Sequence, residues 1–77
     1  MATLRVCVRK TCPSGTAVPG ASVQIDADYG GPSGTTNANG YVDFMYLKMG
    51  YHSVSVNGVF IKTVMVLYYN ETCCEEP

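Results

Sequence analysis

The segment Ala21-Ser-Val-Gln-Ile-Asp-Ala-Asp28 alternates without a break between small or apolar and polar side chains. Successive side chains of a β-strand point to opposite faces of the sheet, so a period of two separates these residues into two sets. One face carries Ala21, Val23, Ile25 and Ala27, and the other carries Ser22, Gln24, Asp26 and Asp28. The pattern predicts a strand that packs one face on a core and leaves the other in water.

The same alternation recurs along the chain, and no window has the i, i+3, i+4, i+7 spacing of an amphipathic helix. Further strands are expected at residues 3–10, around Val42 and Phe44, at residues 51–56 and from residue 59 onward. Segments rich in Gly and Pro separate them, and the pairs Asn39-Gly40 and Asn57-Gly58 favour tight hairpins. About six short strands at this spacing predict an all-β sandwich or a partly open barrel.

The last apolar run, "VFIKTVMVLYY" at residues 59–69, differs from the others because both of its faces are apolar. One face would carry Val59, Ile61, Met65 and Leu67, and the other Phe60, Val64, Val66 and Tyr68. We expect this run to continue as one strand into the cysteine-containing tail, with something covering both of its sides.

Composition limits the classes of function. The chain has 77 residues, a net charge of -1 and only 14% charged residues. A chain of this composition lacks the basic surface of a nucleic-acid binder. No apolar run has the ~20 residues of a membrane span, and residues 1–10 lack the apolar core of a signal peptide. The sequence is therefore either cytosolic as written or a segment whose leader is absent.

Four cysteines in so short a chain favour the second alternative. A domain of this size buries a marginal core and often depends on crosslinks, and disulfides persist mainly in oxidising compartments. We expect one domain spanning residues 1–77, located outside the cell or on its surface.

The strings "TAVPGASVQI", "TTNANGYVDF" and "YLKMGYHSVSV" together resemble the β-sandwich modules grouped as carboxypeptidase-regulatory-like, transthyretin-like and Cna B-type domains. The resemblance covers about residues 16–56 and leaves the C-terminal strand and tail, residues 59–77, outside it. It implies a small antiparallel sandwich of the transthyretin (prealbumin) type with six to seven strands. The family usually places a buried Tyr where this chain has His52, and a bulge that restores Tyr51 to the core would account for the difference.

Residues that carry chemistry are few. His52 is the sole histidine and has no Ser, Cys or Asp near it in a recognised catalytic motif. We therefore expect its side chain to be packed or half-exposed, and we expect the protein not to be an enzyme. Asp26 and Asp28 could contribute to a calcium site, but Ca²⁺ takes 6 to 8 oxygen ligands, and a solvated strand face is the simpler interpretation. No pattern requires a metal or another cofactor.

The cysteines are Cys7, Cys12, Cys73 and Cys74. They lack the C-x2-C spacing of a zinc knuckle, so disulfides are favoured over zinc. Three connectivities are open, of which a bond between the adjacent Cys73 and Cys74 is the least favourable. We expect the C-terminal pair to be joined to Cys7 and Cys12, with a bond from one of them to a neighbouring molecule as a variant.

Asn70-Glu71-Thr72 fits the acceptor sequence for N-glycosylation. The triplet is common by chance, but its position near the chain end beside disulfide-type cysteines favours a covalent glycan on Asn70.

Three classes of function remain. The favoured one is a non-enzymatic extracellular structural or adhesive module that associates with copies of itself through strand edges, as a homo-oligomer or as a subunit of a surface fibre or filament. The alternative is a glycan- or ligand-binding accessory domain excised from a larger secreted enzyme. A small intracellular metal-binding domain is the third, and only the cysteines favour it.

Overall fold

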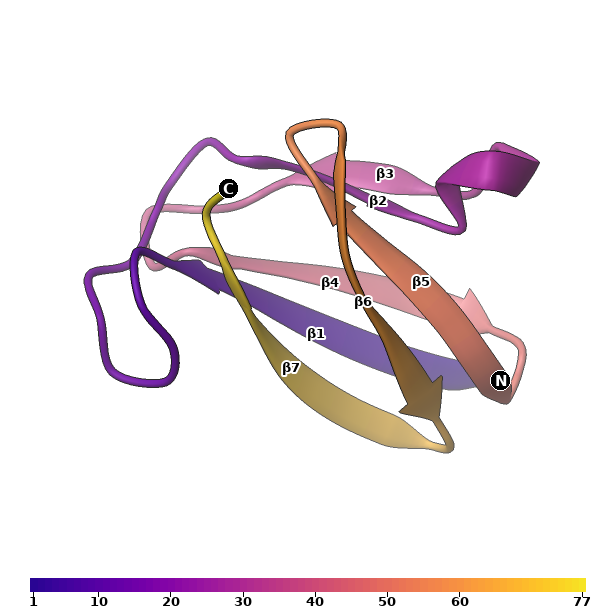
Figure 1. Ribbon diagram of the computed structural model, residues 1–77. Coiled ribbons are helices and arrows are strands. Elements are labelled where there is room, and N and C mark those ends of the chain that lie inside the picture. The colour runs from indigo at the N-terminus through magenta and orange to yellow at the C-terminus, as the bar shows by residue number, and fades with distance from the viewer.

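The computed structural model describes residues 1–77 as seven strands in two sheets, which confirms the all-β sandwich (Figure 1). The first sheet has the order β4-β1-β7, formed by β4 (Tyr41–Leu47), β1 (Ala2–Arg9) and β7 (Tyr69–Glu75). The second has the order β3-β2-β5-β6, formed by β3 (Ser33–Thr35), β2 (Ser22–Ile25), β5 (Gly50–Val56) and β6 (Val59–Val66).

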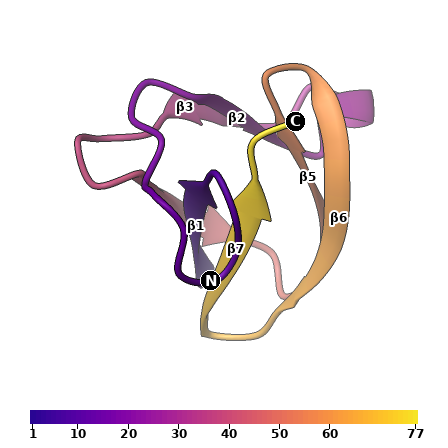
Figure 2. The ribbon, with the colours of Figure 1, turned by 60° about the vertical axis from the view of Figure 1, so that its left-hand side comes forward.

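The core lies between the two sheets, which face each other in Figure 2. Its fully buried aliphatic side chains come from the inner positions of four strands: Leu4, Val6 and Val8 of β1, Val23 and Ile25 of β2, Val54 and Val56 of β5, and Val66 of β6. β1 contributes every second residue, as its alternation predicts, because it lies between two neighbours and has one face in the core.

The strand expected at residues 21–28 is shorter than predicted and ends at Ile25. Asp26 adopts a left-handed backbone conformation, with φ of 51°, and the 3-10 helix η1 (Ala27–Tyr29) follows it. The Asp26 carbonyl accepts hydrogen bonds from the backbone N–H groups of Tyr29 and Gly31. Alternation alone does not reveal this turn, since Ala27 continues the pattern after the strand has ended.

One of the two expected hairpins is confirmed. Asn57 and Gly58 have φ values of 50° and 82° and join β5 to β6, whose antiparallel register continues to the far end of both strands. Two consecutive residues with positive φ match the right-handed twist of the flanking strands, which is why Asn-Gly is favoured there.

The expectation of a hairpin at Asn39-Gly40 is wrong, because β3 and β4 belong to different sheets. The segment is a turn that carries the chain from one sheet to the other. The Asn37 side chain accepts hydrogen bonds from the N–H groups of Asn39 and Tyr41. Gly40 has φ of 81° and passes so close to β1 that a Cβ there would lie 2.8 Å from the Val8 carbonyl oxygen.

The last apolar run does not continue as one strand. β6 ends at Val66 and the chain turns at Leu67 and Tyr68, where the Asn70 side chain accepts a hydrogen bond of 2.8 Å from the Leu67 N–H. β7 then joins the other sheet and pairs with β1 in parallel, so the sandwich is not antiparallel throughout. The parallel register runs from Thr3 opposite Tyr69 to Arg9 opposite Glu75.

Substitution of Leu4 by Ala tests the position of the core. Leu4 is fully buried on the central strand of its sheet, so Leu4→Ala should lower the free energy of unfolding by about 2–5 kcal/mol in urea titrations. Tyr29→Ala is the control, because Tyr29 is 90% exposed and its removal should change stability by less than about 0.5 kcal/mol. Equal effects of the two substitutions would contradict this arrangement of the core.

Candidate functional site

The outer face of the β4-β1-β7 sheet gathers most of the chemically distinctive side chains. Parallel register places three residues of β1 opposite three of β7: Arg5 opposite Glu71, Cys7 opposite Cys73, and Arg9 opposite Glu75. These six residues occupy alternate positions whose intervening β1 neighbours, Val6 and Val8, lie in the core. The outer face of the sheet therefore has two cysteines side by side, with one pair of oppositely charged residues on each side of them along the strands.

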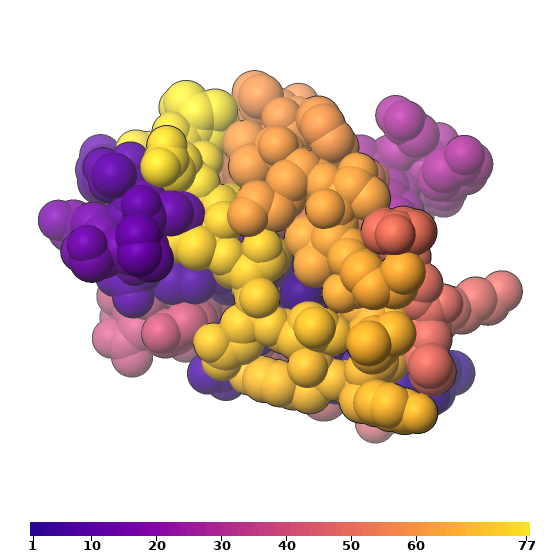
Figure 3. Space-filling view, turned by 60° about the horizontal axis from the view of Figure 1, so that its bottom comes forward, coloured from indigo at the N-terminus to yellow at the C-terminus, as the bar shows by residue number.

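A disulfide joins Cys12 to Cys73, with their Cα atoms 5.9 Å apart. It fixes the loop that follows β1 against the end of β7, where Figure 3 shows the N-terminal loop (indigo) beside the C-terminal residues (yellow). The bond closes a segment of 61 residues, so it connects the first strand and its loop to the last strand.

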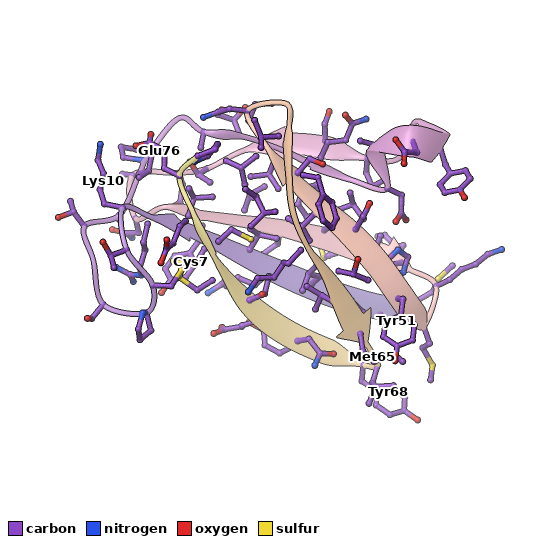
Figure 4. The ribbon with its side chains drawn as sticks, viewed as in Figure 1. Cys7, Lys10, Tyr51, Met65, Tyr68 and Glu76 are labelled. Carbon is purple, nitrogen blue, oxygen red and sulfur yellow. A yellow bond between two sulfur atoms is a disulfide. The ribbon has the colours of Figure 1, made fainter.

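Polar contacts hold the same loop in place. The Cys12 N–H donates to a Glu75 carboxylate oxygen at 3.1 Å, and Arg9 donates to the Gly15 carbonyl at 2.8 Å. Lys10 forms an ion pair with Glu76 at 3.0 Å, visible as neighbouring labels in Figure 4. The loop thus stays near the sheet by several contacts besides the disulfide.

Cys7 and Cys74 are free thiols, which corrects the expectation that all four cysteines form disulfides. Cys74 points into the core and is fully buried, because it follows Cys73 on the strand and so lies on the opposite face. Burial raises the pKa of the Cys74 thiol above its usual range, against the opposing charge of Lys62. Cys7 lies on the outer face and is 8% exposed.

A depression of about 280 Å³ opens on this outer face. Its lining residues are Cys7, Arg9, Pro13, Tyr41, Glu71, Thr72 and Cys73. The depression is therefore lined by the free cysteine Cys7 together with Cys73 of the disulfide.

An ion pair lies farther along the same face. Arg5 donates two hydrogen bonds to the Asp43 carboxylate, at 2.8 and 3.1 Å, and its guanidinium lies 4.9 Å from the centre of the Tyr41 ring. The hydrogen bond from Arg5, aided by its charge, holds the pKa of Asp43 below its usual range. Hydrogen bonding to Glu71 raises the pKa of the neighbouring Tyr69. These pairs are open to solvent and orient the side chains more than they stabilise the fold.

A second polar cluster, around His52, was not foreseen from the sequence. His52 Nδ1 lies 2.6 Å from an Asp26 carboxylate oxygen, and Nε2 lies 2.7 Å from the Lys48 carbonyl. The other Asp26 oxygen accepts the Ser53 N–H at 3.1 Å. The His52 side chain is only 12% exposed, whereas Tyr51 is 72% exposed, so the expectation that a bulge returns Tyr51 to the core is wrong.

Both ring nitrogens of His52 face acceptors, since a carbonyl and a carboxylate can only accept. Both hydrogen bonds therefore form together only when the imidazole is protonated. Burial alone would lower the pKa of His52, but the hydrogen bonds to Lys48 and Asp26 and the Asp26 charge together outweigh it and raise the pKa above 6.5. The cluster ties β5 to the turn after β2 and to the β4–β5 connection.

The remaining candidate residues stay apart. Asp28 lies in η1, and no group of three or more His, Cys, Asp or Glu side chains is arranged to hold a metal ion. Asn70 is the second residue of β7, and its side-chain oxygen closes the preceding turn. Glycosylation at this residue stays a prediction. No helix of the chain has the length and apolarity to cross a membrane.

An exposed apolar strip follows β6 and the turn after it. Its members are Val59, Phe60, Met65, Leu67 and Tyr68, which are 48%, 61%, 39%, 49% and 76% exposed. Tyr51 of β5 pairs with Met65 across the two strands, and Figure 4 shows both at the end of the molecule where Tyr68 also lies. The apolar run seen in the sequence thus keeps exposed side chains from both of the faces assigned to it.

Comparison with known proteins adds no family assignment: no family profile matches the chain, and no curated protein sequence is similar to it. The structure supports an all-β sandwich with a disulfide. These comparisons add no support to the resemblance to transthyretin-like modules.

Reduction of the disulfide should destabilise the domain strongly. Closing a loop of this length lowers the entropy of the unfolded chain by the equivalent of about 4 kcal/mol in the chain-entropy model. Urea unfolding with and without a phosphine reductant measures the difference. Stability that is unchanged on reduction would show that the bond constrains nothing.

Stability should also depend on the protonation of His52. Because folding raises the pKa of His52, its stabilising effect is complete below the unfolded value of about 6.5 and is lost as pH rises through the folded value. We expect the free energy of unfolding of wild type to exceed that of His52→Gln by about 1 kcal/mol at about pH 5.5. This difference should shrink toward about pH 8.5. A difference between the two proteins that is constant with pH would contradict the charged pair.

Proposed function

We propose that this domain is a non-enzymatic structural or adhesive module that associates with copies of itself through the free edge of β6. The observation that carries the proposal is the position of β6 at the end of its sheet, with no hydrogen-bonded strand on its outer edge and with exposed apolar side chains along it and in the turn that follows. An unpaired edge offers N–H and C=O groups to a strand of another molecule.

β6 is the least protected of the four edges. β7 carries Glu71 and Glu75 and is tied to the loop after β1, and β4 is interrupted at Tyr46, where φ is 63°. Charges and irregular backbone are among the usual means by which proteins block edge pairing. β3 is short, with three residues, but it carries no charge.

The available part of the β6 edge is the stretch Lys62–Val66. Lys62 lies opposite Val54 and Phe60 opposite Ser55, so Ile61 is an extra residue, a bulge, before this stretch. The only charge in β6 is Lys62, whose amine donates to Thr72 within the same molecule at 3.1 Å. The edge beyond the bulge is therefore regular, and its one charge, on Lys62, is held toward β7 of the same molecule.

Pairing of β6 with β3 of the next copy would continue the four-stranded sheet, because these strands are its two ends. A head-to-tail contact that does not close produces a filament, whereas pairing of two β6 edges produces a closed dimer. The proposed assembly is the open one, a surface fibre, with the dimer as the competing outcome in the experiment below.

Location outside the cell is part of the proposal. The Cys12–Cys73 disulfide favours an oxidising compartment, and a glycan on Asn70 fits the same location. A relationship to transthyretin-like modules is supported by the left-handed glycines in its motifs, Gly20 and Gly40, and by the Asn37 side chain that caps its turn.

A charge on the β6 edge tests the assembly. Met65→Lys should weaken self-association by about tenfold or more, because pairing would bury a lysine against a neighbouring strand. Sedimentation velocity over a range of concentrations, with negative-stain microscopy of the same samples, distinguishes filaments from dimers and monomers. Met45→Lys, at a residue 61% exposed on β4, is the matched control and should leave assembly intact.

Two results would overturn the proposal. One is a wild-type protein that stays monomeric at every concentration. The other is equal loss of assembly in both lysine variants, which would point to net charge and not to the β6 edge.

A further inference from the structure

We propose that Cys7, Cys12 and Cys73 form an intramolecular thiol–disulfide exchange site, in which the disulfide moves from Cys12–Cys73 to Cys7–Cys73 and releases Cys12 as a thiol on the loop. The inference concerns the outer face of the β4-β1-β7 sheet and is independent of self-association through β6.

Register makes Cys73 able to bond either partner. Cys7 is directly opposite Cys73 in the parallel pair, and neighbouring strands lie about 4.8 Å apart. Disulfides span Cα separations of about 4.4–6.8 Å, a range that includes both this spacing and the 5.9 Å between Cys12 and Cys73. Neither bond requires the strands to move apart.

The free thiol and the disulfide also share one space. Cys7 and Cys73 both line the depression on the outer face, with no residue between them in the register. Cys74 cannot take the place of Cys7, because it is opposite Val8 and points into the core. Figure 4 shows Cys7 at the end of the molecule where Lys10 and Glu76 meet, beside the loop that carries Cys12.

The exchange needs no external oxidant or reductant. The Cys7 thiol loses its proton to water, and its sulfur attacks the Cys73 sulfur. The Cys7–Cys73 bond forms as the Cys12–Cys73 bond breaks, and the Cys12 thiolate leaves with the bonding electron pair and takes up a proton. One disulfide and one thiol are present among these three cysteines before and after the step.

The contacts of the loop make the step reversible. With the Cys12–Cys73 bond in place, the Cys12 N–H donates to Glu75 and Arg9 donates to the Gly15 carbonyl. Neither contact uses a sulfur atom, so the exchange does not itself break them. Cys12 therefore stays near Cys73 at a high effective concentration. Cys12 is partly exposed, whereas Cys7 is buried, so the exchange converts a shielded thiol into one that reagents can reach.

Trapping with a maleimide tests the exchange. Oxidised wild-type protein is incubated near pH 8 with N-ethylmaleimide under native conditions, quenched in acid and digested with trypsin. Cleavage after Arg9 and Lys10 separates Cys7 from Cys12, and fragmentation of the C-terminal peptide distinguishes Cys73 from Cys74. We expect the label to accumulate on Cys12 while Cys7 becomes linked to Cys73.

Two variants complete the test. Cys7→Ala should slow labelling of Cys12 by at least about tenfold, whereas Cys74→Ala, the matched control, should leave it unchanged. Cys12→Ser, oxidised with a glutathione mixture, should contain a Cys7–Cys73 disulfide. Labelling of Cys7 with the Cys12–Cys73 bond intact, equal labelling of Cys12 in Cys7→Ala, or three free thiols in folded Cys12→Ser would each overturn the proposal.

Discussion

The parallel pairing of β1 with β7 is the constraint on which the rest of the structure depends. It joins the first and last strands, and the residues that it places opposite each other, such as Cys7 and Cys73, are separated by most of the chain. Bringing these two strands together has a large entropic cost, because the residues between them are far apart in sequence and must be ordered for the strands to meet. The Cys12–Cys73 disulfide lies at the end of this pair and removes much of that entropic cost.

The same pairing determines what the surface offers. Because β7 leaves the turn after β6 and crosses to β1, β6 has no hydrogen-bonded strand on its outer edge and its apolar strip stays exposed. The alternation of β7 then directs Cys74 into the core and Cys73 onto the outer face beside Cys7. The pairing of β7 with β1 thus accounts for both the candidate assembly edge on β6 and the cysteine cluster on the outer face.

The sequence predicted those features that depend on neighbours along the chain. Strand alternation identified the core positions of β1 and β2, and Asn57-Gly58 identified a hairpin, because each rests on a few adjacent residues. The turn at Leu67 and Tyr68 was missed, since it has no Gly or Pro and is closed by the Asn70 side chain.

Contacts between distant residues were the main omission at the candidate sites. The ion pair of His52 with Asp26 joins residues 26 positions apart, and neither residue lies in a recognised catalytic motif. The choice of Cys73 over Cys74 as the partner of Cys12 depends on the face that each occupies, which follows from the register of β7 and not from spacing. Two adjacent cysteines on one strand point to opposite faces, so the sequence indicates that one is inside but not which one.

Native-state hydrogen exchange, measured with the disulfide intact and after reduction, tests the central role of the β1–β7 pair most directly. β7 is an edge strand whose hydrogen-bonded neighbour is β1 alone, so its amides should lose protection on reduction before those of β5, which has strands on both sides. If β7 and β5 lose protection together, or if β7 keeps its protection after reduction, the disulfide does not hold the parallel pair and the account is wrong.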